Sequence, residues 1–156
     1  MQLLIDPEGA DRNSRVTGIR LAILLTRLME QWRLGRFDAE NALIIVAVIA
    51  ITSEKLVRAG LTDTQRSLEE YLPLSRLQGC NVSSISAATG INRETVRRRV
   101  RRLMDEGALI RTEAGEIALP PERVNDDTAL TLVRRQLEAV TRFMNESIRD
   151  GAVVGE

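Results

Sequence analysis

The 156-residue chain contains no histidine, one cysteine (Cys80) and a single lysine (Lys55). Without histidine there is no imidazole for general acid–base catalysis, and one cysteine cannot complete the Cys/His ligand set of a zinc site. A single cysteine also excludes a disulfide within the chain, and no phosphate-binding glycine loop is present. We therefore expect neither an enzyme nor a metal or other cofactor. Cys80 is expected to be a buried small residue, with redox sensing as the alternative.

Long hydrophobic runs are missing as well. The apolar run at residues 42–51 is far shorter than the ~20 residues needed to cross a bilayer. Residues 1–14 lack a basic start followed by an apolar segment, so they predict a mobile leader and no signal peptide. We expect a soluble, cytoplasmic protein without a membrane partner, and the length predicts one domain with a real core.

The charge is balanced overall but unevenly distributed. The formal net charge is zero, yet residues 81–112 hold seven arginines against three acidic residues. The remainder of the chain is therefore net negative, and the positive charge belongs to one unit. Arginine suits bidentate contacts to guanine and to phosphate better than lysine does.

Two apolar helices are predicted at residues 15–60. In residues 15–34 the apolar positions form a face too broad for one neighbouring helix, and Gly35 follows as a stop. Asp38 is expected to cap a second helix that runs to about Ala59, with a buried strand over residues 44–51 as the alternative. These helices predict a core or dimerisation element. A small-molecule effector held between subunits is the alternative to a simple apolar core.

Residues 61–81 predict a connector. Thr62 or Asp63 is expected to cap a short helix through Tyr71, which Pro73 then breaks.

Residues 83–110 predict a helix, a glycine turn and a second helix. Ser83 is expected to cap the first helix and Asn92 the second, with Gly90 supplying the left-handed backbone of the turn. At 100° per residue, Val96, Val100 and Leu103 form a buried stripe. The opposite, exposed face comprises Glu94, Arg98, Arg101, Arg102 and Asp105.

The motif Thr89-Gly90, Arg93-Glu94-Thr95-Val96, Arg98 and Gly107-Ala108-Leu109-Ile110 resembles the winged helix-turn-helix of bacterial transcription regulators. Arg93–Val96 with Arg98 is similar to the recognition helix of the cyclic-AMP receptor protein superfamily, and Arg93 with Thr95–Arg97 is similar to that of the GntR regulators. The resemblance implies that Arg93, Glu94 and Arg98 read bases in the major groove. Arginine suits guanine O6/N7, and glutamate suits cytosine N4. The expected contacts to the DNA backbone are Ser83, Thr95, Arg97, Arg101, Arg102 and Arg111.

Thr89 and Arg99 depart from this pattern, because these families usually place apolar residues there. We expect the stem of Arg99 to lie along the core while its head reaches water.

Residues 109–119 predict a β-hairpin with a glycine-containing loop, which serves either as a wing on DNA or only as structure. After Pro120-Pro121, a helix is predicted from Asp126 to Arg149, capped by Asp126 or Thr128. Its apolar residues have the spacing of a helix-packing seam, which favours dimerisation over packing on its own domain. They are Leu130, Val133, Leu137, Val140, Met144 and Ile148.

The predicted fold is mainly α, a winged helix-turn-helix with a small β-hairpin wing flanked by N-terminal and C-terminal dimerisation helices, a layout that resembles the MarR regulators. The predicted segments are 1–14, 15–60, 61–81, 82–119, 120–149 and a frayed tail at 150–156. The predicted function is a homodimeric, sequence-specific regulator of transcription that binds double-stranded DNA with helix 93–106. The alternatives are an accessory or architectural DNA-binding protein of replication or partition, a protein-interaction module, and a solvated arginine face without a ligand.

Overall fold

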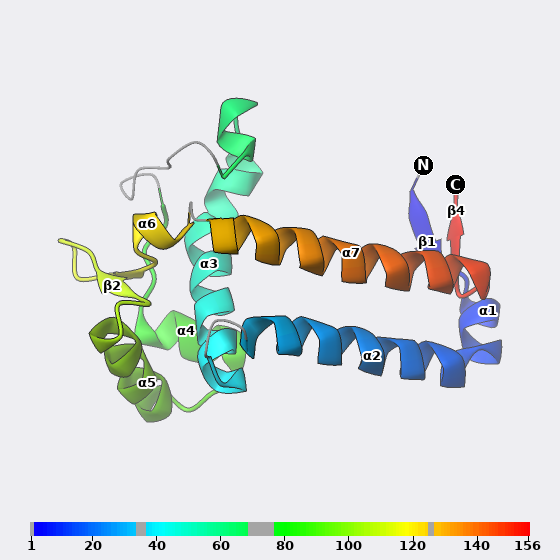
Figure 1. Cartoon of the computed structure of the whole chain (residues 1–156), viewed down its shortest axis with the longest axis horizontal. Coiled ribbons are helices and arrows are strands. Elements are labelled where there is room, and N and C mark those ends of the chain that lie inside the picture. Colours follow the sequence, from blue (N-terminus) through cyan, green and yellow to red (C-terminus); the bar gives the residue numbers. More distant parts are fainter. Residues whose placement is uncertain (1, 34–36, 69–76, 125–126) are drawn as a thin grey trace. The chain divides into compact units, whose positions relative to one another are not determined.

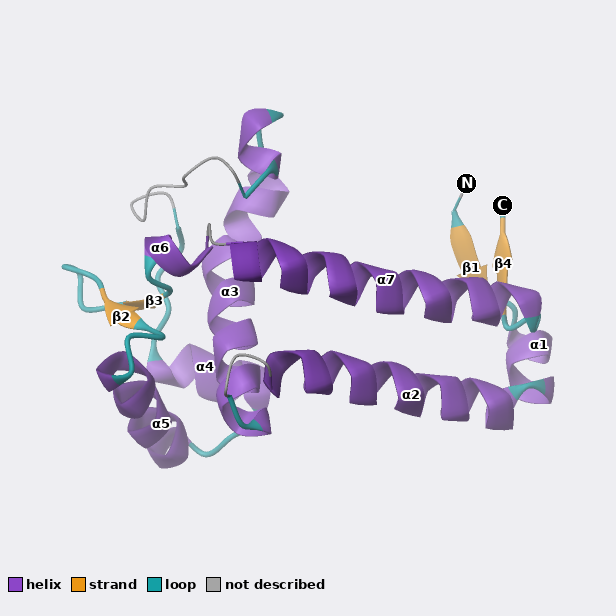
Figure 2. Ribbon diagram, viewed as in Figure 1, coloured by secondary structure: helices purple, strands orange, loops and turns teal. Residues whose placement is uncertain are grey.

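The computed structural model describes residues 2–33, 37–68, 77–124 and 127–156. These residues are mainly helical and contain two small antiparallel sheets (Figure 2), which confirms the mainly α class. The chain forms two compact units, one of residues 1–36 with 131–156 and one of residues 37–130. Among the described residues no helix has both the length and the apolarity to cross a membrane.

The first unit is built on two long helices, α2 (Ser14–Arg33) and α7 (Asp127–Arg149), which lie side by side in Figure 1. They run antiparallel. Near the start of α2, Arg20 forms ion pairs with Glu146 and Asp150 at the far end of α7, with N···O distances of 2.5 and 2.8 Å. Near the end of α2, the Gln31 side chain donates a hydrogen bond to the backbone carbonyl of Arg135. The partner of α2 is thus a helix more than 100 residues away in sequence.

The two ends of the chain pair with each other in this unit. Strand β1 (Leu3–Ile5) is antiparallel to β4 (Val153–Gly155), and the short helix α1 (Pro7–Arg12) leads from β1 to α2. This corrects the prediction of a mobile leader at residues 1–14 and a frayed tail at residues 150–156. Three-residue strands are too short to show the two-residue period, and their partners lie some 150 positions apart, so no local signal announces them.

The second unit is organised around α3 (Ala39–Ala59), which contacts α4 (Val82–Thr89), α5 (Arg93–Asp105) and strand β3 (Ile117–Ala118). Strand β2 (Ile110–Arg111) pairs with β3, and α6 (Pro121–Val124) follows. The fully buried side chains come from α3, α4, α5 and the hairpin. They include Ile44, Val48, Ile85, Val96, Val100, Leu103, Leu109 and Ile117.

Residues 44–51 form part of a helix and not a buried strand. The backbone N–H of Asn41 donates to the Asp38 side chain over 2.8 Å, which confirms Asp38 as the N-cap of α3. Ile44 and Val48 are buried, but Leu43 and Val46 on the other side are about two-fifths exposed. α3 is therefore buried on one face only.

The boundaries differ from the predicted ones at three places. α2 and α3 were expected to form one group at residues 15–60, but they belong to different units because α2 pairs with α7. In the connector, a 3₁₀-helix spans Thr64–Arg66, and the expected end of that helix at Tyr71 and Pro73 lies outside the described residues. Thr128 lies within α7 and does not cap it, while the other expected cap, Asp126, is also outside the described residues.

Candidate nucleic-acid interface

Helix α4 begins one residue before the predicted cap. Asn81 is the N-cap and forms a capping box, in which its side chain accepts from the Ser84 backbone N–H and Ser84 Oγ accepts from the Asn81 N–H, both over 3.0 Å. The prediction that Ser83 caps this helix is therefore wrong. Ser83 instead lies exposed in the first turn. Asparagine and serine cap about equally well, so local preference could not decide between positions 81 and 83.

The turn between α4 and α5 is fixed by one glycine and three side-chain hydrogen bonds. Gly90 has φ +72°, the left-handed backbone expected there. Ser86 Oγ donates to the Ile91 carbonyl, and Thr89 Oγ1 donates to the Ile85 carbonyl while accepting from the Ile91 N–H. Thr89, at a position that is usually apolar in the resembling families, thus holds the turn.

Helix α5 has one buried face and one charged face, as predicted. Asn92 caps it by accepting from the Glu94 N–H, and Val96, Val100 and Leu103 are 0–2% exposed. Thr95 is half-buried at the edge of the two faces. The exposed side chains of the helix are Arg93, Glu94, Arg97, Arg98, Arg101, Arg102 and Asp105.

Several of these exposed side chains have partners on the protein. Arg93 of α5 donates to Ser83 Oγ of α4, so a predicted base-reading residue and a predicted backbone-contacting residue lie together. Arg97 pairs with Glu94, and Arg102 pairs with Glu106 over 2.8 Å. Such exposed pairs stabilise by only about 0–1 kcal/mol, and they exchange readily for a phosphate or a base edge.

Arg98 and Arg101 differ from these arginines. Within the described ranges, neither side chain has a hydrogen-bond or ion-pair partner, and both are exposed. Their guanidinium groups therefore project from a rigid helix without first having to leave a partner.

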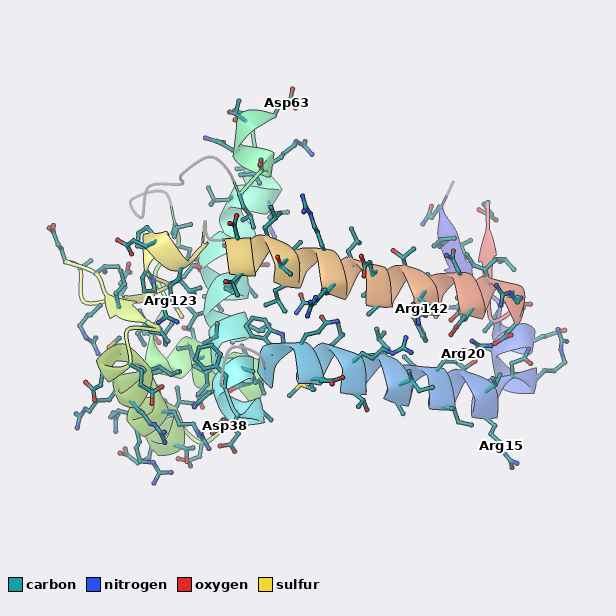
Figure 3. All side chains as sticks on the ribbon, viewed as in Figure 1. Arg15, Arg20, Asp38, Asp63, Arg123 and Arg142 are labelled. Carbon is teal, nitrogen blue, oxygen red and sulfur yellow. The ribbon has the colours of Figure 1, made fainter. Side chains whose placement is uncertain are left out.

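Arg99 has a role that the sequence did not indicate. Its guanidinium donates to Asp38 and Asn41 over 2.8 and 3.1 Å and also pairs with Glu40, all at the start of α3 (Asp38 is labelled in Figure 3). Only 23% of the Arg99 side chain is exposed, so its head is held against α3 and does not reach freely into water as expected. The one signal for this role was a charged residue at a position that is usually apolar.

The same contacts shift the pKa of Asp38. The hydrogen bond from the Asn41 backbone and the nearby Arg99 guanidinium both favour the carboxylate, so the pKa of Asp38 lies below its ordinary value. The pKa of Arg99 is raised, chiefly by its hydrogen bond to Asp38. Asp38 therefore links the cap of α3 to the position of α5.

The predicted hairpin is present, with strands of two residues each. Ile110 lies opposite Ala118, and Gly115 has φ +80° in the loop. Arg111 is exposed, but it donates to the Gly115 carbonyl over 2.7 Å and so braces its own loop. The backbone N–H of Ile117 donates to the Cys80 carbonyl, which ties the hairpin to the segment before α4.

Cys80 is buried, and burial raises the pKa of its thiol. A buried thiol held in its neutral form is a poor nucleophile, which agrees with the expected structural role.

Comparison of the chain with protein-family models, with curated proteins and with solved structures finds no match.

Proposed function

We propose that the protein is a winged helix-turn-helix regulator of transcription that binds double-stranded DNA sequence-specifically, as a homodimer, and reads the major groove with helix 93–106. The observation that supports this most strongly is the mounting of α5. It is capped at its start, buried on one face against α3 and α4, and carries five exposed arginines on the rest of its surface.

The dimensions and chemistry of α5 suit this role. A helix about 10–12 Å wide fits the ~12 Å major groove of B-DNA. Arg93, Glu94 and Arg98 are assigned to base edges. Arg98 is the best prepared of the three because its side chain has no partner among the residues that the structure describes. Ser83, Thr95, Arg97, Arg101, Arg102 and Arg111 are assigned to the backbone. A phosphate near the start of α5 also gains from the positive end of the helix dipole.

The first test is selection of bound fragments from randomised duplex DNA or from genomic DNA. A sequence-specific dimer enriches one motif with two related half-sites about one helical turn apart. Enrichment of a single unrepeated motif contradicts the homodimer, and enrichment of no motif contradicts sequence-specific reading.

Two further measurements separate the alternatives. Occupancy across the genome is confined to promoters for a regulator and is widespread for an architectural or accessory protein. For a protein-interaction module, DNA affinity stays weak and partner binding lacks the steep fall with salt that follows counterion release.

A further inference from the structure

The two long helices of the first unit have many solvent-exposed apolar side chains. On α2, Leu21, Leu25 and Met29 are 41–60% exposed. On α7, Val133, Leu137, Val140 and Ile148 are 39–63% exposed. Leu21, Leu25, Leu28 and Trp32 recur at steps of four, three and four, and Val133, Leu137, Val140, Met144 and Ile148 at steps of four, three, four and four, which is the spacing of a helix-packing seam.

Each seam lies to the side of its helix, away from the other helix of the pair. On α2, Arg20 and Gln31 mark the direction toward α7, and at 100° per residue the seam lies roughly 100° round the helix from them. On α7, the buried Ala139 and Ser147 with Glu146 mark the direction toward α2, and its seam lies roughly 120° round from them. The sense of rotation, seen from each helix's own N-terminus, is the same.

Because the helices run antiparallel, equal rotations in the same sense bring the two seams to one side of the pair. The result is a single apolar face, here called the α2–α7 face, comprising Leu21, Leu25, Leu28, Trp32, Val133, Leu137, Val140, Met144 and Ile148. It contains no charged residue. By the same arithmetic, the opposite side of the pair carries charged residues such as Glu30, Arg135 and Arg142, together with the exposed Ile19 and Ile23 of α2.

On each helix, the angle between the side that faces the other helix and the side that carries the seam indicates what covers the α2–α7 face. In a four-helix bundle every helix contacts two neighbours at nearly right angles, and both contacts use heptad-spaced apolar residues. α2 and α7 have each other as neighbours, through the ion pairs of Arg20 and the hydrogen bond of Gln31, and each presents an apolar seam at nearly this angle to that contact. What is missing is another antiparallel pair of the same length with an uncharged face, and a second copy of the chain supplies it.

The size of the face fits such a contact. Val133 to Ile148 spans about 22 Å of helix, and two helices side by side are about 20 Å wide. The flat footprint is thus roughly 450 Å² per chain, and interdigitating side chains bury more than the footprint. This lies within the roughly 300–600 Å² of the largest apolar patches on monomers, which are often functional, and approaches the roughly 600–800 Å² per partner of specific dimers.

We infer that a second copy of this chain packs on the α2–α7 face and completes an antiparallel four-helix bundle across a twofold axis. The inference rests on the homodimer of the proposed function and gives it a surface. It requires nothing of α5, so dimerisation and DNA binding are tested separately.

The test compares two matched substitutions on α2 in the full-length chain. Leu25→Glu changes a residue on the face that is 60% exposed, and Ile19→Glu changes one that is 56% exposed on the other side of the same helix. Leu137→Glu repeats the test on α7. Mass is measured by light scattering during gel filtration, and helix content by circular dichroism.

Wild type and Ile19→Glu are expected at twice the 17.4 kDa of the chain. Leu25→Glu and Leu137→Glu are expected as folded monomers, with the dimer Kd raised at least ~100-fold because each variant buries two unpaired carboxylates per dimer. If Leu25→Glu loses helix content, Leu25→Gln is measured in its place. A monomeric wild type overturns the inference, as do face variants that remain as dimeric as Ile19→Glu. If a monomeric variant still binds a half-site of the selected motif better than a scrambled duplex, the proposed reading of DNA sequence holds whether or not the dimer forms on the α2–α7 face.

Discussion

The contact of Arg99 with the start of α3 makes the most specific prediction about stability. Arg99→Met keeps the apolar stem that lies along the core and removes the guanidinium. Asp38, Glu40 and Asn41 then lose a shared donor. The matched substitution is Arg98→Met, one position away on the exposed face of the same helix.

The magnitude follows from burial. Asp38 and Glu40 are 54% and 50% exposed, so solvent screens both ion pairs and each contributes only about 0.2–1 kcal/mol. Asn41 is 5% exposed, and leaving its buried oxygen without a donor costs about 1–3 kcal/mol. Since these contributions overlap, we expect Arg99→Met to lower the free energy of unfolding by about 1–3 kcal/mol.

The assay is urea unfolding followed by circular dichroism, with both variants and wild type in the same buffer. Arg98→Met is expected within about 0.5 kcal/mol of wild type, as is usual for an exposed position. If Arg99→Met unfolds at the same urea concentration as Arg98→Met, the guanidinium does not hold α5 on α3. DNA binding should show the reverse order, with Arg98→Met the more damaging of the two at concentrations where both are folded.

Four further substitutions test the local structure around α5. The pKa of Asp38 is lowered in the folded chain, so its carboxylate stabilises the fold above the ordinary aspartate pKa. This contribution disappears as the pH falls through the folded pKa. In urea titrations, Asp38→Asn should therefore lose less stability than wild type between about pH 6 and about pH 3. Asn81→Ala should cost about 0.5–2 kcal/mol and Ser83→Ala much less in the same unfolding assay, and equal costs would show that the capping box is misplaced. Gly90→Ala should lower the thermal midpoint of unfolding, at a cost of about 1 kcal/mol. A side chain at φ +72° is strained even though no atom lies near the added Cβ. An unchanged midpoint would mean that the turn has another backbone conformation.

The parts of the fold that could be predicted from the sequence are those decided by neighbours in sequence. The stripe of Val96, Val100 and Leu103 follows from helical periodicity, and the caps at Asp38 and Asn92 follow from side chains that reach a backbone N–H two or three residues away. The turn at Gly90 is equally local. These features place the exposed arginines of α5 before any tertiary contact is known.

The remaining features depend on contacts between distant residues. Arg99 and Asp38 are 61 positions apart, and nothing in either neighbourhood shows that they meet. The pairing of α2 with α7, and of β1 with β4, joins the two ends of the chain. The wide apolar stripe of α2 predicted more than one neighbour, but only the antiparallel arrangement with α7 shows that the two remaining seams share one side.

The affinity of Arg98→Ala for DNA tests the proposal that α5 reads DNA sequence. Fluorescence anisotropy would measure Kd for a duplex carrying the selected motif and for a scrambled duplex at one fixed salt concentration. The matched control is Arg58→Ala, which removes an exposed arginine of the same unit from α3. Arg98→Ala is expected to weaken binding to the selected duplex by about 1–3 kcal/mol, or roughly 5- to 150-fold, and binding to the scrambled duplex much less. Arg58→Ala is expected to change neither affinity appreciably. Equal losses on both duplexes, or no loss for Arg98→Ala, would contradict the proposal.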